Sequence, residues 1–169
     1  MDDRVRGALD GVAPIEAAGV TVSVTPRFDR AVLRGDAAAF GVGLPDQVGS
    51  VAERDAGAVL CLGPDEWLAL AIPGGAVLRV AGAGAAVDVG HRQTALDITG
   101  RLAAALLNAG CPLDLHVTAF PPGSCTRTVC GKAEIVLWRR AAERFHVEVA
   151  RSYAAYLWAF LAENARGLR

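Results

Sequence analysis

Residues 110–132 read GCPLDLHVTAFPPGSCTRTVCGK, and this stretch joins two regular elements in one specific way. Gly110 can take the left-handed conformation that ends a helix, and Pro112 cannot continue one. Pro121-Pro122-Gly123 then turns the chain just before an alternating segment begins at Ser124. The stretch therefore predicts the end of a helix followed by the start of a β-meander.

Charge and length limit the classes of protein to consider. The 169 residues carry a formal net charge of −1, with lysine and arginine scattered along the chain. A polyphosphate partner needs a clustered basic surface, so we expect no nucleic-acid binding. No apolar run approaches the ~20 residues of a membrane helix, and the start, MDDRVRGALD, is unlike a signal peptide. We expect a cytoplasmic protein without a membrane partner.

The four cysteines, Cys61, Cys111, Cys125 and Cys130, are expected to be thiols, because disulfides are rare in a reducing compartment. The chain has no CxxC pair. Cys125 and Cys130 are five apart on one predicted strand, so their side chains point to opposite faces of the sheet. We therefore expect buried cysteines and no metal site; the alternative is a site built from Cys111, His116 and one of the other two cysteines.

In the first half of the chain, hydrophobic alternation and turn residues predict short strands, two short helices and one long loop. We expect residues 1–19 to be poorly ordered. The predicted strands are residues 20–25, 31–34, 58–62 and 67–72. The predicted helical turns are residues 36–40 and 77–80, and the predicted loop is residues 41–57.

The second half reads as strands 86–91 and 94–98, a helix at 100–109, a meander and a final helix. Val87, Val89, Leu96 and Ile98 are placed on the inward phase. Thr99 is the predicted N-cap of the first helix, whose apolar face is Leu102, Ala105, Leu106 and Ala109. The meander strands are residues 125–130, 134–139 and 145–149, and Ser152 is the predicted N-cap of the last helix.

The last meander strand alternates. Phe145, Val147 and Val149 are apolar, while His146 and Glu148 fall between them. Such alternation is typical of a strand with one buried face, so His146 and Glu148 are predicted to lie on the polar face.

The order of elements indicates the fold class. It is ββαββα followed by ββαβββα, and from the second strand onward it contains the βαββαβ order of a ferredoxin-like unit. A second such unit follows that lacks one strand, which residues 20–25 can supply. We predict an α+β fold of two intertwined ferredoxin-like units with helices on one side. The predicted single domain is residues 20–169, with half-units at about 31–91 and at about 94–165 plus the strand 20–25.

Motifs for catalysis or cofactor binding are missing. Gly82-Ala83-Gly84 lacks a third glycine and precedes a strand, so it does not fit a dinucleotide fingerprint. The three histidines have no catalytic spacing, and no GxSxG motif is present. We therefore assign no catalytic, cofactor-binding or metal residue. Asp88, Asp97 and Arg92 are the first polar groups to look for in a cleft, although an N-cap or turn-closing role suits the aspartates better.

Three further segments carry a family resemblance together with residues 110–132. They are CLGPDEWL at 61–68, DVGHRQTALDITG at 88–100 and ARSYAAYLWAFLAE at 150–163. From about residue 58 onward the chain resembles the gamma subunit of heterotetrameric sarcosine oxidase. The resemblance implies a non-catalytic subunit with a fold like the folate-binding domains of aminomethyltransferases such as the glycine-cleavage T-protein.

The resemblance also implies partners and cofactors. The alpha subunit is the expected partner, with beta and delta reached through it. FAD, FMN, NAD and tetrahydrofolate are expected on those other subunits, and none on this chain. The alternatives are a stand-alone folate-dependent protein that handles aminomethyl or one-carbon groups, and a scaffold protein unrelated to one-carbon chemistry.

Three residues are candidates for the partner interface. Trp67 and Trp138 occupy strand positions and are expected in the core, whereas Trp158 falls off the main apolar stripe of the last helix. That stripe is Tyr153, Tyr156, Leu157, Phe160 and Leu161. An exposed tryptophan is a typical interface anchor. Arg127 and Arg151 lie in the most family-like segments; for both, internal pairing with acidic groups of the meander is favoured over a role at the partner surface.

Overall fold

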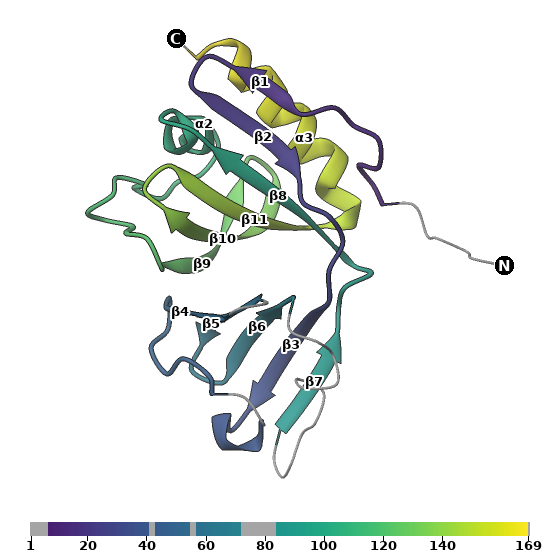
Figure 1. Ribbon diagram of the computed structural model, residues 1–169, viewed down its shortest axis with the longest axis vertical. Helices are drawn as coiled ribbons and strands as arrows, with labels where there is room; N and C mark the ends of the chain where they lie inside the picture. The colour runs from purple at the N-terminus through teal and green to yellow at the C-terminus, as the bar shows by residue number, and fades with distance from the viewer. Residues whose placement is uncertain (1–6, 41–42, 55–56, 72–83, 169) are drawn as a thin grey trace, which may run out of the picture.

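The computed structural model describes residues 7–40, 43–54, 57–71 and 84–168 and contains two antiparallel sheets (Figure 1). The six-stranded sheet has the order β1 (Ile15–Ala17), β2 (Val20–Val24), β8 (Gln93–Thr99), β11 (Arg144–Ala150), β10 (Ala133–Ala141), β9 (Cys125–Cys130). The five-stranded sheet has the order β4 (Val51–Arg54), β5 (Gly57–Gly63), β6 (Glu66–Leu70), β3 (Arg30–Gly35), β7 (Gly84–Asp88).

The chain crosses from one sheet to the other and back. The chain leaves the six-stranded sheet after β2, builds the five-stranded sheet from β3 to β7, and returns at β8. There β2 pairs with β8, with Val22 opposite Ile98 and Val24 opposite Leu96. The predicted fold class, an α+β fold of intertwined ferredoxin-like units, is confirmed, and the early strand pairs with the later half of the chain as expected.

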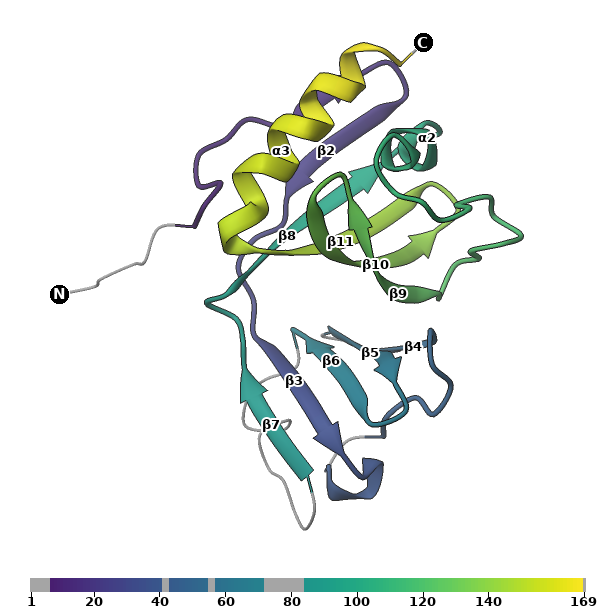
Figure 2. The same cartoon turned by 180° about the vertical axis from the view of Figure 1, so that it is seen from behind.

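Two helices, α2 (Ala103–Asn108) and α3 (Arg151–Arg166), cover the face of the six-stranded sheet that points away from the five-stranded sheet (Figure 2). The larger core lies beneath them. On α3 the buried residues are Ala154, Leu157, Leu161 and Ala165, at the spacing of one helical face. They pack over alternate residues of the central strands, including Leu96, Leu137 and Val147. The buried face of the helix and the inward residues of the strands thus form one apolar layer.

A second core lies between the sheets. It joins Leu60, Leu68 and Leu70 of the five-stranded sheet to Cys125 and Trp138 of the six-stranded sheet. The outer face of the five-stranded sheet carries a third cluster, which includes Leu33, Val59, Trp67 and Phe40. The inner strands β5 and β6 of the five-stranded sheet are therefore largely buried on both faces, and every residue of β6 is buried. The prediction that Trp67 and Trp138 belong to the core is confirmed.

Residues 110–132 are held by side-chain and backbone contacts. The buried Arg139 guanidinium donates to the carbonyl oxygens of Leu115 and Phe120 at 2.9 Å each. Gly110 was predicted to take a left-handed conformation, and it does not. A glycine is required at this position because a Cβ would lie 2.6 Å from the Gly131 nitrogen and 2.7 Å from the Phe160 ring. Close approach, and not a helix cap, explains this glycine.

Both predicted side-chain N-caps are wrong. The cap of α2 is Leu102. Gly100 has φ +117°, and the Leu102 nitrogen donates to the Gly19 carbonyl at 2.9 Å. The helix therefore begins at Ala103, three residues later than the predicted start at residue 100. The buried residues of α2 are accordingly Ala103, Leu106 and Leu107, and Ala105 and Ala109 are exposed. α3 follows β11 directly, and the Arg151 nitrogen donates to the Arg92 carbonyl at 2.7 Å, so Ser152 lies inside the helix.

Other expectations differ locally. β4 lies in the segment predicted as loop, paired with β5 at the edge of its sheet. β1 lies within residues 1–19, expected to be poorly ordered, and Leu9 in that segment is 5% exposed. Val87, which was placed on the inward phase, is 56% exposed, since β7 is an edge strand.

The helical turn predicted at residues 36–40 is confirmed as η1 (Ala37–Ala39), capped by Asp36. The predicted helix at 77–80 lies outside the described residues. Within the described residues, no helix has the length and apolar character to span a membrane.

Candidate functional site

Three buried ionisable residues lie at the junction of the two sheets. Glu148 of β11 binds the Arg30 Nε of β3 through Oε2 at 2.7 Å, and its Oε1 lies 2.8 Å from His146 Nε2. The side chains of Arg30 and Glu148 are 2% and 1% exposed. The prediction that His146 and Glu148 lie on a solvated face is wrong, because β3 and its sheet cover that face of β11.

The environment of this buried triad, defined as Arg30, His146 and Glu148, is aromatic. The Arg30 guanidinium lies 3.9 Å from the centroid of the Phe28 ring and donates to the Phe28 carbonyl at 3.1 Å. The His146 ring meets the Trp138 ring edge-on, with centroids 5.8 Å apart. Buried charges are tolerated only when they are paired and hydrogen-bonded. Glu148 is the residue that satisfies both basic partners.

Sequence reasoning did not find the triad as a unit. Arg30 and Glu148 are 118 positions apart, and no local pattern links them. The alternation along β11 shows that its apolar face is buried, but it does not show whether a second sheet covers the polar face. Polar residues at alternate positions of a strand are therefore compatible with buried pairing as well as with exposure.

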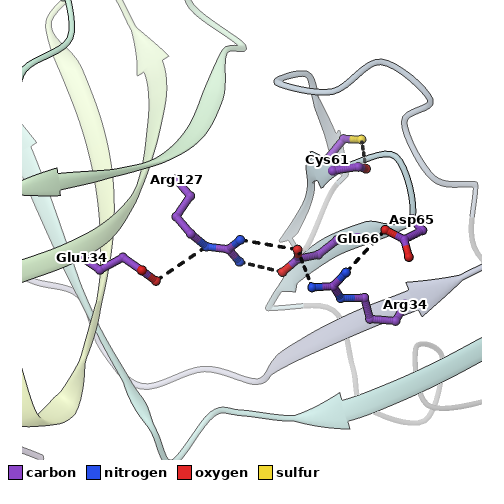
Figure 3. Close-up of polar contacts among 7 residues, drawn as sticks. Arg34, Cys61, Asp65, Glu66, Arg127 and Glu134 are labelled. Atoms are coloured by element: carbon purple, nitrogen blue, oxygen red, sulfur yellow. Dashed lines mark hydrogen bonds and ion pairs between the residues drawn. The ribbon is translucent and has the colours of Figure 1, made fainter.

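A second charged network joins the sheets nearer the surface (Figure 3). Arg127 of β9 donates to both carboxylate oxygens of Glu66 of β6, at 2.6 and 3.4 Å. Arg34 of β3 also binds Glu66, at 2.8 Å, and reaches Asp65 at 3.4 Å. Glu134 lies 3.7 Å from Arg127. We call these five residues the surface bridge.

Glu66 is the centre of the surface bridge. Its side chain is 10% exposed, whereas that of Arg127 is 40% exposed. The hydrogen bond from Arg127 holds the pKa of Glu66 below its ordinary value, against the opposite effect of burial. The same bond raises the pKa of Arg127. Arg127 is therefore paired internally as expected, but its main partner is Glu66 on the other sheet, and only the 3.7 Å contact to Glu134 is with the meander.

The exposed and buried sides of α3 differ from the prediction. Tyr153 was placed on the packed stripe, yet it is 48% exposed. Trp158 is half-buried and packs against the core beneath the helix. The apolar stripe is centred on Ala154 and Leu157, so Tyr153 and Trp158 lie on its two sides. Trp158 thus contributes to folding contacts, and its expected separation from the core is wrong.

Arg151 begins α3 and is half-buried. It lines a pocket of about 280 Å³ together with Arg27, Arg30 and His91. The structure does not bring Arg151 together with Arg127 in one site, because Arg127 belongs to the surface bridge on β9.

The aspartates have structural roles. Asp88 Oδ1 accepts a hydrogen bond from the Gly90 nitrogen at 2.8 Å, which confirms the turn-closing interpretation. Asp97 is bound by Arg144 through three contacts of 2.6 to 3.1 Å. Arg92 is exposed and uses its carbonyl oxygen at the start of α3.

All four cysteines are buried. Cys125 lies in the core between the sheets and Cys130 in the core beneath the helices, so the prediction of opposite faces is confirmed. Burial raises the pKa of Cys125 to about 12 and that of Cys130 to about 11. Across the described residues, no three His, Cys, Asp or Glu side chains are grouped to hold a metal ion. His116 is exposed and its Nδ1 lies 2.8 Å from Thr118 Oγ1.

The family is decided by comparison with known sequences. The family model described as "Sarcosine oxidase, gamma subunit family" matches residues 23–166. The chain belongs to this family. The predicted resemblance to the gamma subunit is confirmed, and the match extends well before residue 58, where the resemblance was expected to begin.

Similar gamma subunits come from two bacterial genera. The sarcosine oxidase subunit gamma of Arthrobacter sp. is 38% identical over 118 residues, which are 66% of this chain and 58% of that protein. The subunit gamma of Corynebacterium sp. strain P-1 is 37% identical over 128 residues, 71% of this chain and 63% of that protein. The chain thus spans about three fifths of the length of these relatives.

Solved structures agree with the family. A chain of the heterotetrameric sarcosine oxidase from Corynebacterium sp. U-96, in complex with pyrrole 2-carboxylate, aligns with a TM-score of 0.84 and 28% identity, covering 96% of this chain and 95% of that chain. The glycine cleavage system aminomethyltransferase T of Bartonella henselae aligns with a TM-score of 0.66 and 13% identity, covering 89% of this chain and 47% of that one. The second likeness concerns the fold alone.

Proposed function

We propose that this gamma-family chain acts as a non-catalytic structural subunit of a heterotetrameric sarcosine oxidase. The observation that carries the proposal is the alignment, over 96% of the chain, with a chain of an assembly of that name. The assembly oxidatively demethylates sarcosine to glycine and passes the one-carbon unit to tetrahydrofolate on the alpha subunit. In this proposal FAD, FMN, NAD and tetrahydrofolate are held by the other subunits, and the complex is cytoplasmic.

The use of ionisable side chains supports a structural role. A general acid or base needs a group that can donate or accept a proton and that can face a substrate. Glu148 and His146 are instead buried against each other, and Glu66 is engaged by two arginines. These groups join the two sheets, which favours a rigid subunit whose task is to present a surface.

The alpha subunit is the proposed partner, and beta and delta are reached through it. For the contact surface we retain Trp158, Arg127 and Arg151 as proposed interface residues. The Arg127 side chain is 40% exposed while it binds Glu66, so its remaining donors can reach a partner. Arg151 is half-buried and Trp158 is half-buried at the edge of α3, where part of each side chain is accessible.

Co-expression tests the role. Cells that express alpha, beta and delta with or without this chain should differ in the yield of assembled complex, while turnover of sarcosine per assembled complex stays the same. The purified chain should be colourless and should produce no peroxide from sarcosine. A flavin spectrum on the isolated chain, or full assembly without it, would contradict the proposal.

A second test addresses the surface. Trp158→Ala should weaken capture of the alpha subunit by about 2 kcal/mol or more, the size of an interface hot spot. Leu157→Ala, which empties a buried site, is the matched control for lost packing and should cost about 2–5 kcal/mol of unfolding free energy. Capture is measured at a temperature where both variants are folded. Equal capture by Trp158→Ala and wild type removes Trp158 from the interface.

The folate-handling alternative rests on the likeness to aminomethyltransferase T, which at 13% identity concerns only the fold. A scaffold unrelated to one-carbon chemistry would not explain membership of the gamma family. Retention of reduced folate by the purified chain is the measurement that would favour the first alternative.

A further inference from the structure

Strand β9 is an outer strand of the six-stranded sheet and the longest of the four edge strands of the two sheets (Figure 1). It pairs with β10 along one side, without a shift of register. The strand contains no proline, lysine or bulge, which are common devices that keep an edge strand from pairing with another chain. By contrast, β1 has only three residues, and β4 has four and ends in Glu53 and Arg54.

The hairpin between β9 and β10 decides which backbone groups of β9 point outward. Cys130 lies opposite Ala133 and two residues connect them, so these two residues form a hydrogen-bonded pair. Bonded and non-bonded pairs alternate along an antiparallel ladder. The backbone N–H and C=O groups of Arg127 and Val129 therefore point away from β10, toward the free side of the strand.

Backbone contacts at both ends of β9 agree with this alternation. The Cys125 N–H donates to the Gly49 carbonyl at 2.7 Å, and the Gly131 N–H donates to the Gly110 carbonyl at 3.0 Å. Both contacts lie on the free side of β9, which therefore accepts backbone from other parts of the chain. In the part of the chain that the structure describes, the two outward N–H groups between these contacts have no backbone acceptor.

The unpaired stretch has room for a short strand. The two end contacts are six residues apart, which is about 20 Å in an extended strand. At one end the chain turns away from β9, because Gly49 has φ +88° and the Ser50 N–H donates to the Gln47 carbonyl. The Arg127 carbonyl accepts the Thr126 hydroxyl at 3.3 Å and has a second lone pair for a partner.

The side chains on this stretch do not oppose pairing. An unpaired charge on an edge strand discourages a neighbour, but the Arg127 guanidinium is directed toward the five-stranded sheet and is bound by Glu66 at 2.6 Å (Figure 3). Val129 lies on the same face of β9, two residues on, and is 42% exposed. The free side of β9 thus offers unpaired backbone next to apolar surface.

We propose that an extended segment of the alpha subunit adds to β9 as a further strand of the six-stranded sheet. This inference rests on the proposed function, in which the alpha subunit is the partner. An antiparallel segment forms one bonded pair with Arg127 and one with Val129, and so four backbone hydrogen bonds. Its residue opposite Val129 is apolar, because cross-strand neighbours share one face of a sheet.

Hydrogen exchange resolved to single residues tests the pairing. In the isolated chain the amides of Thr126 and Thr128, which face β10, should exchange slowly, and those of Arg127 and Val129 should exchange fast. In the complex assembled with alpha, beta and delta, exchange at Arg127 and Val129 should slow by about tenfold or more. Fast exchange of both amides in the complex, or protection of both in the isolated chain, would overturn the inference.

Variants of Val129 test the same contact through binding. Val129→Pro removes the outward N–H and no bond to β10, a position where an edge strand tolerates proline. Capture of the alpha subunit should weaken by about tenfold or more. Val129→Ile, the matched control, keeps the N–H and the apolar side chain and should capture like wild type.

Spectral dispersion verifies that each variant is folded. Should Val129→Pro unfold, Val129→Lys keeps every backbone group, places a charge on the edge, and should give the same loss of capture. Equal capture by the folded Val129 variants and wild type would overturn this inference alone. A wild-type chain that does not assemble with the other subunits would overturn the proposed function, and this inference with it.

Discussion

The buried triad and the surface bridge connect the same two sheets, but they use different physics. Both place a glutamate between basic residues of different strands, and their shortest contacts are 2.7 and 2.6 Å. In the triad, Arg30 and Glu148 are almost inaccessible to water; in the surface bridge, Arg127 is 40% exposed. Contacts of similar length are therefore expected to differ in how much unfolding free energy is lost on mutation, because the cost of removing one partner depends on whether water can replace it.

The largest expected effect is at Glu148. Glu148→Ala leaves the Arg30 charge buried without its partner and removes the partner of His146, so the unfolding free energy should fall by about 3–5 kcal/mol. Urea unfolding followed by fluorescence measures the change. The double variant Arg30→Met with Glu148→Leu is the control, and it should recover most of the loss because both charges are removed together. A loss below about 1 kcal/mol for Glu148→Ala would show that water reaches Arg30.

At the surface bridge a smaller effect is expected. Glu66→Ala should lower the unfolding free energy by about 1 kcal/mol, near the upper end for pairs at the surface, because Glu66 is itself largely buried while its arginines stay hydrated. A double-mutant cycle with Arg127→Ala isolates the pair. A loss as large as that of Glu148→Ala would remove the difference between the two networks.

The pH dependence of the surface bridge has a definite sign. The Arg127 hydrogen bond lowers the pKa of Glu66 in the folded state relative to the unfolded value of about 4.3. The folded state therefore binds fewer protons, so the stabilisation is present above about pH 4.3 and is lost as the pH falls through the folded pKa. Wild type and Glu66→Gln should differ in unfolding free energy at neutral pH and converge below that folded pKa. A difference that grows with acidification would contradict the assignment.

Salt should produce the smallest change. At 1 M salt the screening length is about 3 Å, so the stabilisation by the Arg127–Glu66 pair should shrink by a few tenths of a kcal/mol. The coupling between Arg30 and Glu148 should stay constant, because ions do not reach it. Repeating both double-mutant cycles at low and high salt gives the comparison, and an equal salt response of the two pairs would count against it.

Much of the fold was predictable because its signals are local. The strands of the meander, the inward residues Leu96 and Ile98, and the opposite faces of Cys125 and Cys130 follow from a period of two. The strand 20–25 was correctly assigned to the later half of the chain from element order. The helix caps were not predictable, because backbone carbonyls of Gly19 and Arg92, distant in sequence, replace the expected Thr99 and Ser152.

The candidate site was less predictable than the fold. Arg127 was identified from a family-like segment, but its principal partner Glu66 lies on the other sheet, 61 positions away. Tyr153 and Trp158 were assigned to the wrong degrees of burial, because the apolar stripe of α3 is rotated toward its small residues Ala154 and Ala165. Periodicity locates a stripe within about one residue, which is too coarse to separate half-buried from exposed side chains.

By itself the sequence determined the strand and helix pattern, the intertwined α+β fold and the family, because each depends on spacing and residue type along the chain. The tertiary structure alone decided which polar residues are buried. His146 and Glu148 alternate with apolar residues as they would on a one-sided sheet, and only the packing of β3 and its sheet against β11 buries them, with Glu148 paired to Arg30 and in contact with His146. Burial is a property of what covers a face, and a covering sheet that is distant in sequence leaves no mark on the strand beneath it.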